Sequence, residues 1–197
     1  MSKKKADVET FKNYLQQFPH YTPEIFEVAI PYLVERQVKE GEYFLPLGKI
    51  CREIAFVEEG LFRHYYLHEG TEITNCFCKE GEIMTSYKSM VTEKESEVAI
   101  QAIESSKVIL ISYESLQKLF DQHLFWQQVG RLAVEQELIF TEGHKRLVTD
   151  LSAMERYKHI LDHDPLLLQR VPLIFLASYL QIRPETLSRI RAKLAHT

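Results

Sequence analysis

Basic side chains gather near the carboxyl end of the chain, with a single carboxylate among them. Five bases stand against one acid within residues 169–197, so this segment carries +4 although the whole protein carries −4. Arginine pairs bidentately with guanine, glutamate accepts from cytosine, and arginine or lysine binds phosphate irrespective of base sequence. The segment has the chemistry to contact a nucleic acid, although a solvated basic face would carry the same charge. The charged residues are Arg170, Arg183, Glu185, Arg189, Arg191 and Lys193.

An apolar stripe determines which of these side chains point outward. Leu187, Ile190 and Leu194 recur at i, i+3 and i+7, which predicts a helix over residues 184–194 with one buried face. A shorter amphipathic helix is predicted over residues 173–180, and only three residues separate the two. Two short helices joined this tightly are typical of a helix-turn-helix, whose second helix enters the major groove of DNA, although a plain helical hairpin would show the same apolar spacing. The outward residues expected to contact bases or phosphates are Arg183, Glu185, Ser188, Arg189, Arg191 and Lys193.

Upstream, glycines divide residues 34–112 into short runs with alternating polar and apolar residues. Turn residues at intervals of roughly 7 to 12 residues are typical of a compact β-sandwich or barrel. A helix over residues 23–34 is predicted to precede the strands, because Thr22 can cap it and Pro23 suits its first position. The glycines are Gly41, Gly48, Gly60, Gly70 and Gly81.

A long helix is predicted over residues 124–150, and at 1.5 Å per residue it would extend roughly 40 Å. This is more than a small β-domain needs for its own core, so the helix is expected to pair with a second copy of the chain. The alternative is a helix that folds back on its own domain. Gln136 and Gly143 interrupt the apolar stripe, which favours a seam in the first half of the helix. The seam residues are predicted to be Val129, Leu132, Gln136 and Ile139.

These elements suggest an α+β chain with three parts. Residues 1–123 would form a β-roll domain with flanking helices, 124–150 the dimerisation helix, and 151–197 the helix-turn-helix domain. The last part is expected to open on a capping box, since Ser152 and Glu155 have the required spacing.

Cysteine usage and hydropathy restrict the classes of protein and the expected compartment. Three cysteines are too few for a disulfide framework, and neither they nor the strand histidines His64 and His68 have the spacing of a metal site. No stretch approaches the roughly 20 apolar residues that cross a bilayer, and the amino terminus lacks an apolar signal region. The protein is therefore expected to be cytoplasmic, without a bound metal and without a membrane partner.

The segment FLASYLQIRPETLSRIRAKL resembles the recognition segment of the Crp/Fnr family of bacterial transcription regulators. The strings EEGLFRHYY, KEGEI and KVILIS and the long helix follow in the family's order, so the resemblance covers roughly residues 24–194. It implies a double-stranded β-helix (jelly-roll) sensor of the cyclic-nucleotide-binding kind, a dimerising central helix and a winged-helix-like domain. By the same resemblance, Glu185 and Arg189 would read bases and Thr186 would lie near the phosphates.

The recognition segment departs from the family pattern in three places. Gln181 stands where the family usually has a turn glycine, and a positive φ there would cost on the order of 1 kcal/mol. Arg183 replaces the usual capping hydroxyl, and its side chain cannot accept hydrogen bonds from the backbone amides of the helix. Few residues follow Leu194, so no wing hairpin is expected after the recognition helix.

The resemblance also implies positions for an effector pocket. Gly81 and Glu82 match the pair that meets the ribose of a cyclic nucleotide, and Thr141 matches a residue that meets the base. Ser96 falls at the position of the arginine that binds the cyclic phosphate, and Glu97 beside it would repel an anion. Cyclic AMP binding is therefore not expected. No cofactor is assigned, and the effector stays unidentified.

Two other functions compete with that of a DNA-binding regulator. A metal-dependent cupin-type enzyme would need a His-x-His ligand pair, which does not occur in the chain. A sensor module that binds another protein instead of DNA would show the same β-domain and long helix. The expected protein is a non-enzymatic homodimeric regulator whose partners are double-stranded DNA, a second copy and an unidentified small molecule, with RNA polymerase as a further candidate. The sequence does not indicate the operator or whether the protein activates or represses.

Overall fold

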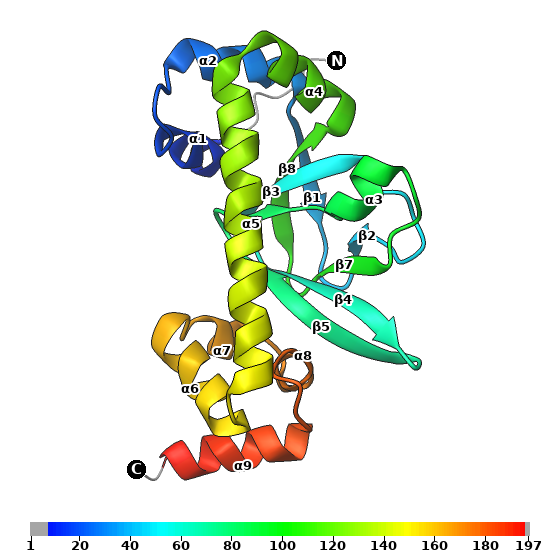
Figure 1. Cartoon of the computed structure of the whole chain (residues 1–197), viewed down its shortest axis with the longest axis vertical. Helices are drawn as coiled ribbons and strands as arrows, with labels where there is room; N and C mark the ends of the chain where they lie inside the picture. The colour runs from blue at the N-terminus through cyan, green and yellow to red at the C-terminus, as the bar shows by residue number, and fades with distance from the viewer. Residues whose placement is uncertain (1–7, 196–197) are drawn as a thin grey trace. The chain divides into compact units, whose positions relative to one another are not determined.

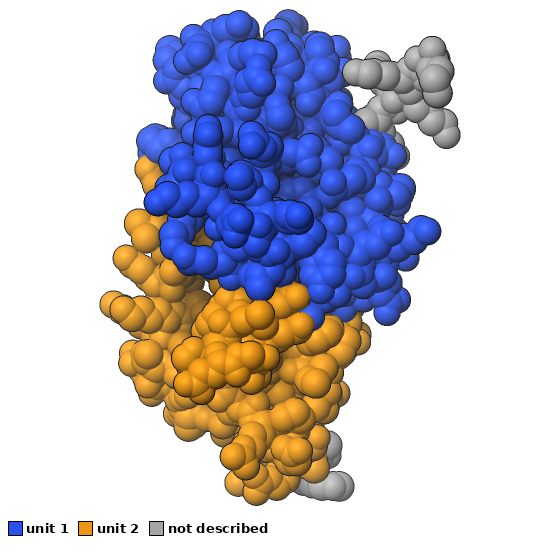
Figure 2. Space-filling model, turned by 90° about the vertical axis from the view of Figure 1, so that its right-hand side faces the viewer, with its two compact units in different colours: residues 1–64, 77–134 blue, residues 65–76, 135–197 orange. Residues whose placement is uncertain are grey.

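The computed structural model describes residues 8–195, which divide into two compact units. Residues up to 64 together with 77–134 form the first unit, and residues 65–76 together with the residues from 135 onward form the second (Figure 2). Each unit is therefore assembled from segments far apart in the chain. The sequence predicts boundaries at residues 123 and 150 between parts with different roles. The two units are defined by compactness instead, so these boundaries stay a prediction.

The β-region folds into two four-stranded sheets within the described residues (Figure 1). One sheet has the order β1 (Val34–Val38), β8 (Ser106–Ser112), β3 (Glu53–Glu59), β6 (Ile83–Met84). The other has the order β2 (Tyr43–Leu45), β7 (Val98–Ala102), β4 (Phe62–His68), β5 (Thr71–Cys78). The pairs of the first sheet and the pair β2–β7 are antiparallel. The predicted β-roll is thus confirmed.

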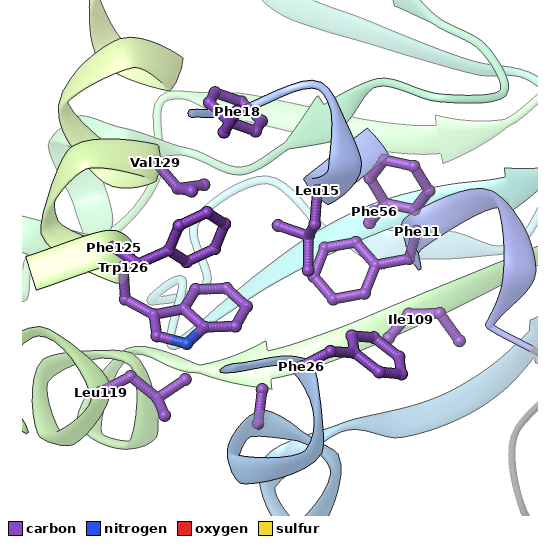
Figure 3. Packing of buried hydrophobic residues seen from close by; sticks show 11 residues of the cluster. Phe11, Leu15, Phe18, Phe26, Phe56, Ile109, Leu119, Phe125, Trp126 and Val129 are labelled. Carbon is purple, nitrogen blue, oxygen red and sulfur yellow. The ribbon is translucent and has the colours of Figure 1, made fainter. Parts of the chain in front are cut away.

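Helices cover one face of the first sheet and close its core. Three precede the strands: α1 (Glu9–Gln16), α2 (Pro23–Ala29) and the 3₁₀ turn η1 (Ile30–Tyr32). Two follow them: α4 (Tyr113–Gln122) and the first half of α5 (Leu124–Asp150). Their aromatic side chains meet those of β3, with the rings of Phe11 and Phe56 5.0 Å apart (Figure 3). The cluster comprises Phe11, Leu15, Phe18, Phe26, Ala29, Phe56, Ile109, Leu119, Phe125, Trp126 and Val129.

The amino-terminal helices differ from the sequence prediction in one respect. The helix predicted to reach residue 34 ends at Ala29, and η1 follows before β1 begins at Val34. Pro31 explains the change, because it has no amide hydrogen and so cannot continue an α-helical hydrogen-bond ladder. The predicted cap at the other end is present, since the Thr22 side chain accepts from the Ile25 amide.

The predicted dimer seam requires a correction in the first half of α5. Val129 is only 6% exposed and belongs to the aromatic cluster, and Leu132 packs against that cluster. Both side chains share the face of α5 that carries Phe125 and Trp126, so the chain's own core already covers them. Gln136 is exposed, and Ile139 is 71% exposed. The stripe at Val129 and Leu132 therefore serves its own unit, whereas a seam at Gln136 and Ile139 stays a prediction.

The second unit is a helical domain that also includes the tip of the β4–β5 hairpin. Its helices after α5 are α6 (Ala153–His163), α7 (Leu167–Arg170), α8 (Leu173–Tyr179) and α9 (Pro184–Ala195). The capping box at the start of α6 is confirmed, with Ser152 N donating to Glu155 Oε2 at 2.8 Å. Leu176, Leu180 and Leu187 are fully buried at its centre. No helix within residues 8–195 is both long and apolar enough to span a membrane.

We predict that Gly60→Ala destabilises the first unit by about 2 kcal/mol more than Gly41→Ala does. Both glycines have positive φ, 109° and 80°, so both substitutions strain the backbone. Only at Gly60 would the new Cβ also collide with Ser106, whereas nothing lies within 4 Å of the Cβ position at Gly41. Urea unfolding of the two variants measures the difference. Equal stabilities would contradict the packing described at Gly60.

Candidate nucleic-acid interface and sensor region

The turn between α8 and α9 is fixed by two backbone hydrogen bonds. Gln181 N donates to Ser178 O and Ile182 N donates to Ala177 O, both at 3.0 Å. This is the Schellman arrangement, which ends a helix on a left-handed residue. Gln181 has φ 53°, so the positive φ expected at this non-glycine residue is present. Pro184 then begins α9, and the Arg183 carbonyl accepts from the Thr186 and Leu187 amides.

Packing orients α9 as the sequence pattern predicts. Leu187 and Ile190 are buried at 0% and 7% exposure within the same unit as Leu176 and Leu180 of the α8 segment. The opposite face is solvated: six of the seven predicted contact residues are exposed, and Thr186 is half-buried. The exposed six are Arg183, Glu185, Ser188, Arg189, Arg191 and Lys193.

The exposed side chains of α9 divide into a stripe and a flank. Glu185, Arg189 and Lys193 lie at i, i+4 and i+8, which places them on one side of the helix. Arg189 Nη2 donates to the Thr186 hydroxyl at 3.2 Å, and this contact directs the guanidinium along the same face. Arg191 follows Arg189 by two residues, roughly 200° round the helix, and so lies on the other side of α9 from the stripe. The Ser188 hydroxyl donates to the Pro184 carbonyl at 3.0 Å, so it remains available only as an acceptor.

Hydrogen bonds from Ser178 tie α8 to the β4–β5 hairpin. Its hydroxyl donates to the Glu72 carbonyl at 3.0 Å and accepts from the Thr74 amide at 2.9 Å. Next to it, the Tyr179 ring stacks on His144 of α5 with centroids 4.6 Å apart, and burial lowers the pKa of His144. Sequence analysis missed these contacts, because no local pattern marks a hydroxyl that binds a strand about 100 residues away.

The residues predicted for the effector pocket are distributed over both units. Gly81, with φ 84°, and Glu82 form the turn between β5 and β6, where the Glu82 carboxylate accepts from the Lys79 amide. This geometry matches a turn retained for the fold. Glu97 points into solvent and pairs with Lys88 at 2.8 Å. Thr141 is exposed on the part of α5 that belongs to the second unit.

Ser96 belongs to a buried pair of hydroxyl groups. Its side chain is 3% exposed, and its hydroxyl lies 2.8 Å from the Ser86 hydroxyl and 2.7 Å from the Val98 carbonyl. Ser86 precedes α3 (Tyr87–Thr92) and is itself 7% exposed. A small buried hydroxyl pair therefore occupies the position at which the resemblance implied an arginine. Sequence reasoning missed Ser86, whose only signal was its place before a short helix.

A half-buried imidazole and a buried thiol lie at the base of the β4–β5 hairpin. His64 Nε2 is 3.5 Å from Cys78 Sγ, and burial lowers the pKa of His64 to about 4. The imidazole is therefore neutral at neutral pH. Across residues 8–195 no three histidine, cysteine or acidic side chains are grouped so that they could hold a metal ion.

We predict that His64 makes the folded state sensitive to acid. Its pKa is below the ordinary value of 6.5, so the unfolded chain binds an extra proton as pH falls from about 6.5 to about 4. The free energy of unfolding should drop by about 2 kcal/mol over this window, less than the full shift implies because the side chain retains some exposure. Urea unfolding at about pH 7 and about pH 4 measures the loss. His64→Gln should abolish this part of the loss, whereas the exposed His68→Gln control should retain it.

Comparisons with known proteins agree with this architecture. Residues 35–123 match the family of the cyclic nucleotide-binding domain. The comparison with curated protein sequences found no significant match.

Solved structures of bacterial regulators are similar to this chain. FixK2 from Bradyrhizobium japonicum has 22% identity and a TM-score of 0.73 over 83% of this chain and 85% of that one. The c-di-GMP responsive regulator CLP from Xanthomonas campestris has 19% identity and a TM-score of 0.69 over 89% and 92%. A CooA mutant from Carboxydothermus hydrogenoformans has 14% identity and a TM-score of 0.68 over 98% and 87%. Residues 35–123 therefore match the cyclic nucleotide-binding domain family, and the chain as a whole has the fold of solved Crp/Fnr transcription regulators.

Proposed function

We propose that this protein is a homodimeric, sequence-specific DNA-binding transcription regulator whose β-roll senses a ligand other than a cyclic nucleotide. The observation that carries the proposal is the solvated face of α9, on which Glu185 and Arg189 stand one turn apart over a buried leucine and isoleucine. A helix held by a Schellman turn and presenting this pair can enter a major groove. The fold shared with bacterial regulators supports the same conclusion.

Charge supports a division of roles along α9. Arg189 has the fork geometry to bind guanine O6 and N7, and Glu185 can accept from the cytosine amino group. Arg183, Arg191 and Lys193 would bind phosphates, which supply affinity and register without reading sequence. The local charge of +4 in an otherwise acidic chain would direct this face, rather than any other, toward DNA.

Dimerisation is proposed through the outer face of α5. Val134, Leu138 and Ile139 are 45%, 59% and 71% exposed, an unusual amount of apolar surface for one helix. Val134 and Leu138 are four residues apart and so lie on the same side, opposite the stripe that packs into the aromatic cluster. Val134 and Leu138 form this outer seam, which replaces the predicted one at Val129 and Leu132. The exposed Ile139 lies seven residues after Leu132 and continues the line of that residue instead.

The sensor is proposed to have lost its cyclic-phosphate site. The buried Ser86 and Ser96 hydroxyls satisfy each other, and they bring no positive charge to the position. A phosphate placed there would find no cation in either side chain and a carboxylate, Glu97, on the adjacent residue. The effector is therefore expected to be a molecule without a cyclic phosphate.

We predict that Arg189→Ala weakens binding to the selected operator by about 1–3 kcal/mol and relaxes discrimination at one base pair. The operator is first selected from random duplexes with the full chain, and affinities are then measured by fluorescence anisotropy at fixed salt. Lys158→Ala is the matched control, because Lys158 is an exposed base on α6 of the same unit but lies outside α9. Unchanged affinity and base preference in Arg189→Ala would remove this residue from the interface.

We predict that Leu138→Glu converts the dimer into monomers, because it places a charge in the proposed apolar seam. Sedimentation velocity measures the mass, and the same variant should lose most of its operator affinity because one half-site would then bind alone. Leu166→Glu is the control, since Leu166 is 61% exposed but lies outside α5. A wild-type monomer, or a Leu138→Glu dimer, would contradict the seam.

A further inference from the structure

We propose that His159 and His163 of α6 form a chelating site for a divalent transition-metal ion of the copper, nickel or zinc type. This goes beyond DNA binding, because neither residue belongs to α8 or α9. The two histidines are four residues apart, so they lie on one face of the helix in successive turns. Their rings stack with centroids 4.1 Å apart and planes inclined by 29°, so the two imidazoles are immediate neighbours. A rotation of one ring out of the stack would direct both lone pairs at one ion.

A backbone contact fixes which ring nitrogen of His163 can bind a metal. His163 Nδ1 lies 2.8 Å from the His159 carbonyl oxygen. A carbonyl only accepts, so Nδ1 carries the proton and Nε2 keeps its lone pair. Metal-ligating histidines usually donate their second nitrogen to a carbonyl or carboxylate in this way, because it holds the ring and its tautomer.

The surroundings favour an approaching cation. The Asp162 carboxylate, three residues from His159, adds negative charge on the cation's path. The nearest arginine on α6, Arg156, directs its guanidinium to the carbonyl oxygens of Leu151 and Leu180 instead.

Two protein ligands define what kind of site this is. Within the part of the chain that the structure describes, no third histidine, cysteine or acid joins a group of metal-ligand residues. Water would complete the coordination, so the ion exchanges with solvent and its affinity follows the intrinsic preference of imidazole, copper above nickel and copper above zinc. Magnesium and calcium prefer oxygen ligands and should not compete.

A metal ion bound by both histidines would cross-link the last two turns of α6. The inner face of the same helix buries Tyr157 and Ile160 in the second unit. An ion that binds the folded helix but finds the two imidazoles apart in the unfolded chain stabilises the folded state. The site would thus couple metal concentration to the stability of the unit that carries α9.

Isothermal titration of the full chain without an affinity tag tests the proposal, using copper, nickel and zinc chlorides. We expect one ion per chain, with copper bound most tightly. His159→Ala or His163→Ala should each lower the affinity at least about tenfold, because the second imidazole otherwise acts at high effective concentration. His68→Ala is the control, since His68 is an exposed histidine of the β4–β5 hairpin. Circular dichroism verifies that each variant is folded.

A second measurement locates the ion independently of affinity. In proton spectra, substoichiometric copper should first broaden the imidazole signals of His159 and His163. If the His159→Ala, His163→Ala double variant binds these ions as tightly as the wild type, or if another histidine broadens first, the proposal is wrong.

Discussion

Aromatic packing between the amino-terminal helices, β3 and the first turns of α5 is the constraint on which the rest of the structure depends. Phe11, Phe56 and Trp126 meet in one cluster, and burial of each such side chain contributes roughly 2–3 kcal/mol. This cluster holds one side of α5 against the sheet. The residues of its first turns on that side, down to Val129 and Leu132, are thereby committed to the chain's own core.

The geometry of the α8–α9 pair depends on a second, smaller constraint. Gln181 adopts a left-handed conformation that costs on the order of 1 kcal/mol for a residue with a Cβ. The strain is offset because the Schellman hydrogen bonds satisfy two carbonyls of α8 and because Leu176, Leu180 and Leu187 close over the turn. The long side chains of α9 are mobile by themselves, so their placement comes from the buried face beneath them.

Patterns confined to neighbouring residues could be predicted from the sequence. The capping box at Ser152 and the buried face of α9 both follow from spacings of three or four residues. The length of α5 was likewise predicted correctly, with bounds at Leu124 and Asp150.

Interactions between distant segments could not be predicted in this way. Periodicity shows that Val129 lies on an apolar stripe, but not whether a second copy or the chain's own aromatic cluster covers it. The resemblance to a family string identified Gly81, Glu82 and Ser96 as pocket residues. It did not identify Ser86, whose hydroxyl forms a hydrogen bond with that of Ser96. The pairing of Ser178 with β5 leaves no trace in either local sequence.

The Ser178 contact has a consequence for the order in which the chain folds. β5 is the outer strand of its sheet, and the hydroxyl that satisfies Glu72 and Thr74 is synthesised about 100 residues later. Until α8 leaves the ribosome, the nascent β-roll has an open strand edge, which is the kind of surface that templates aggregation. Synthesis of α8 therefore also covers this part of the sheet edge, so a chain terminated before α8 would be prone to aggregate even though its core is intact.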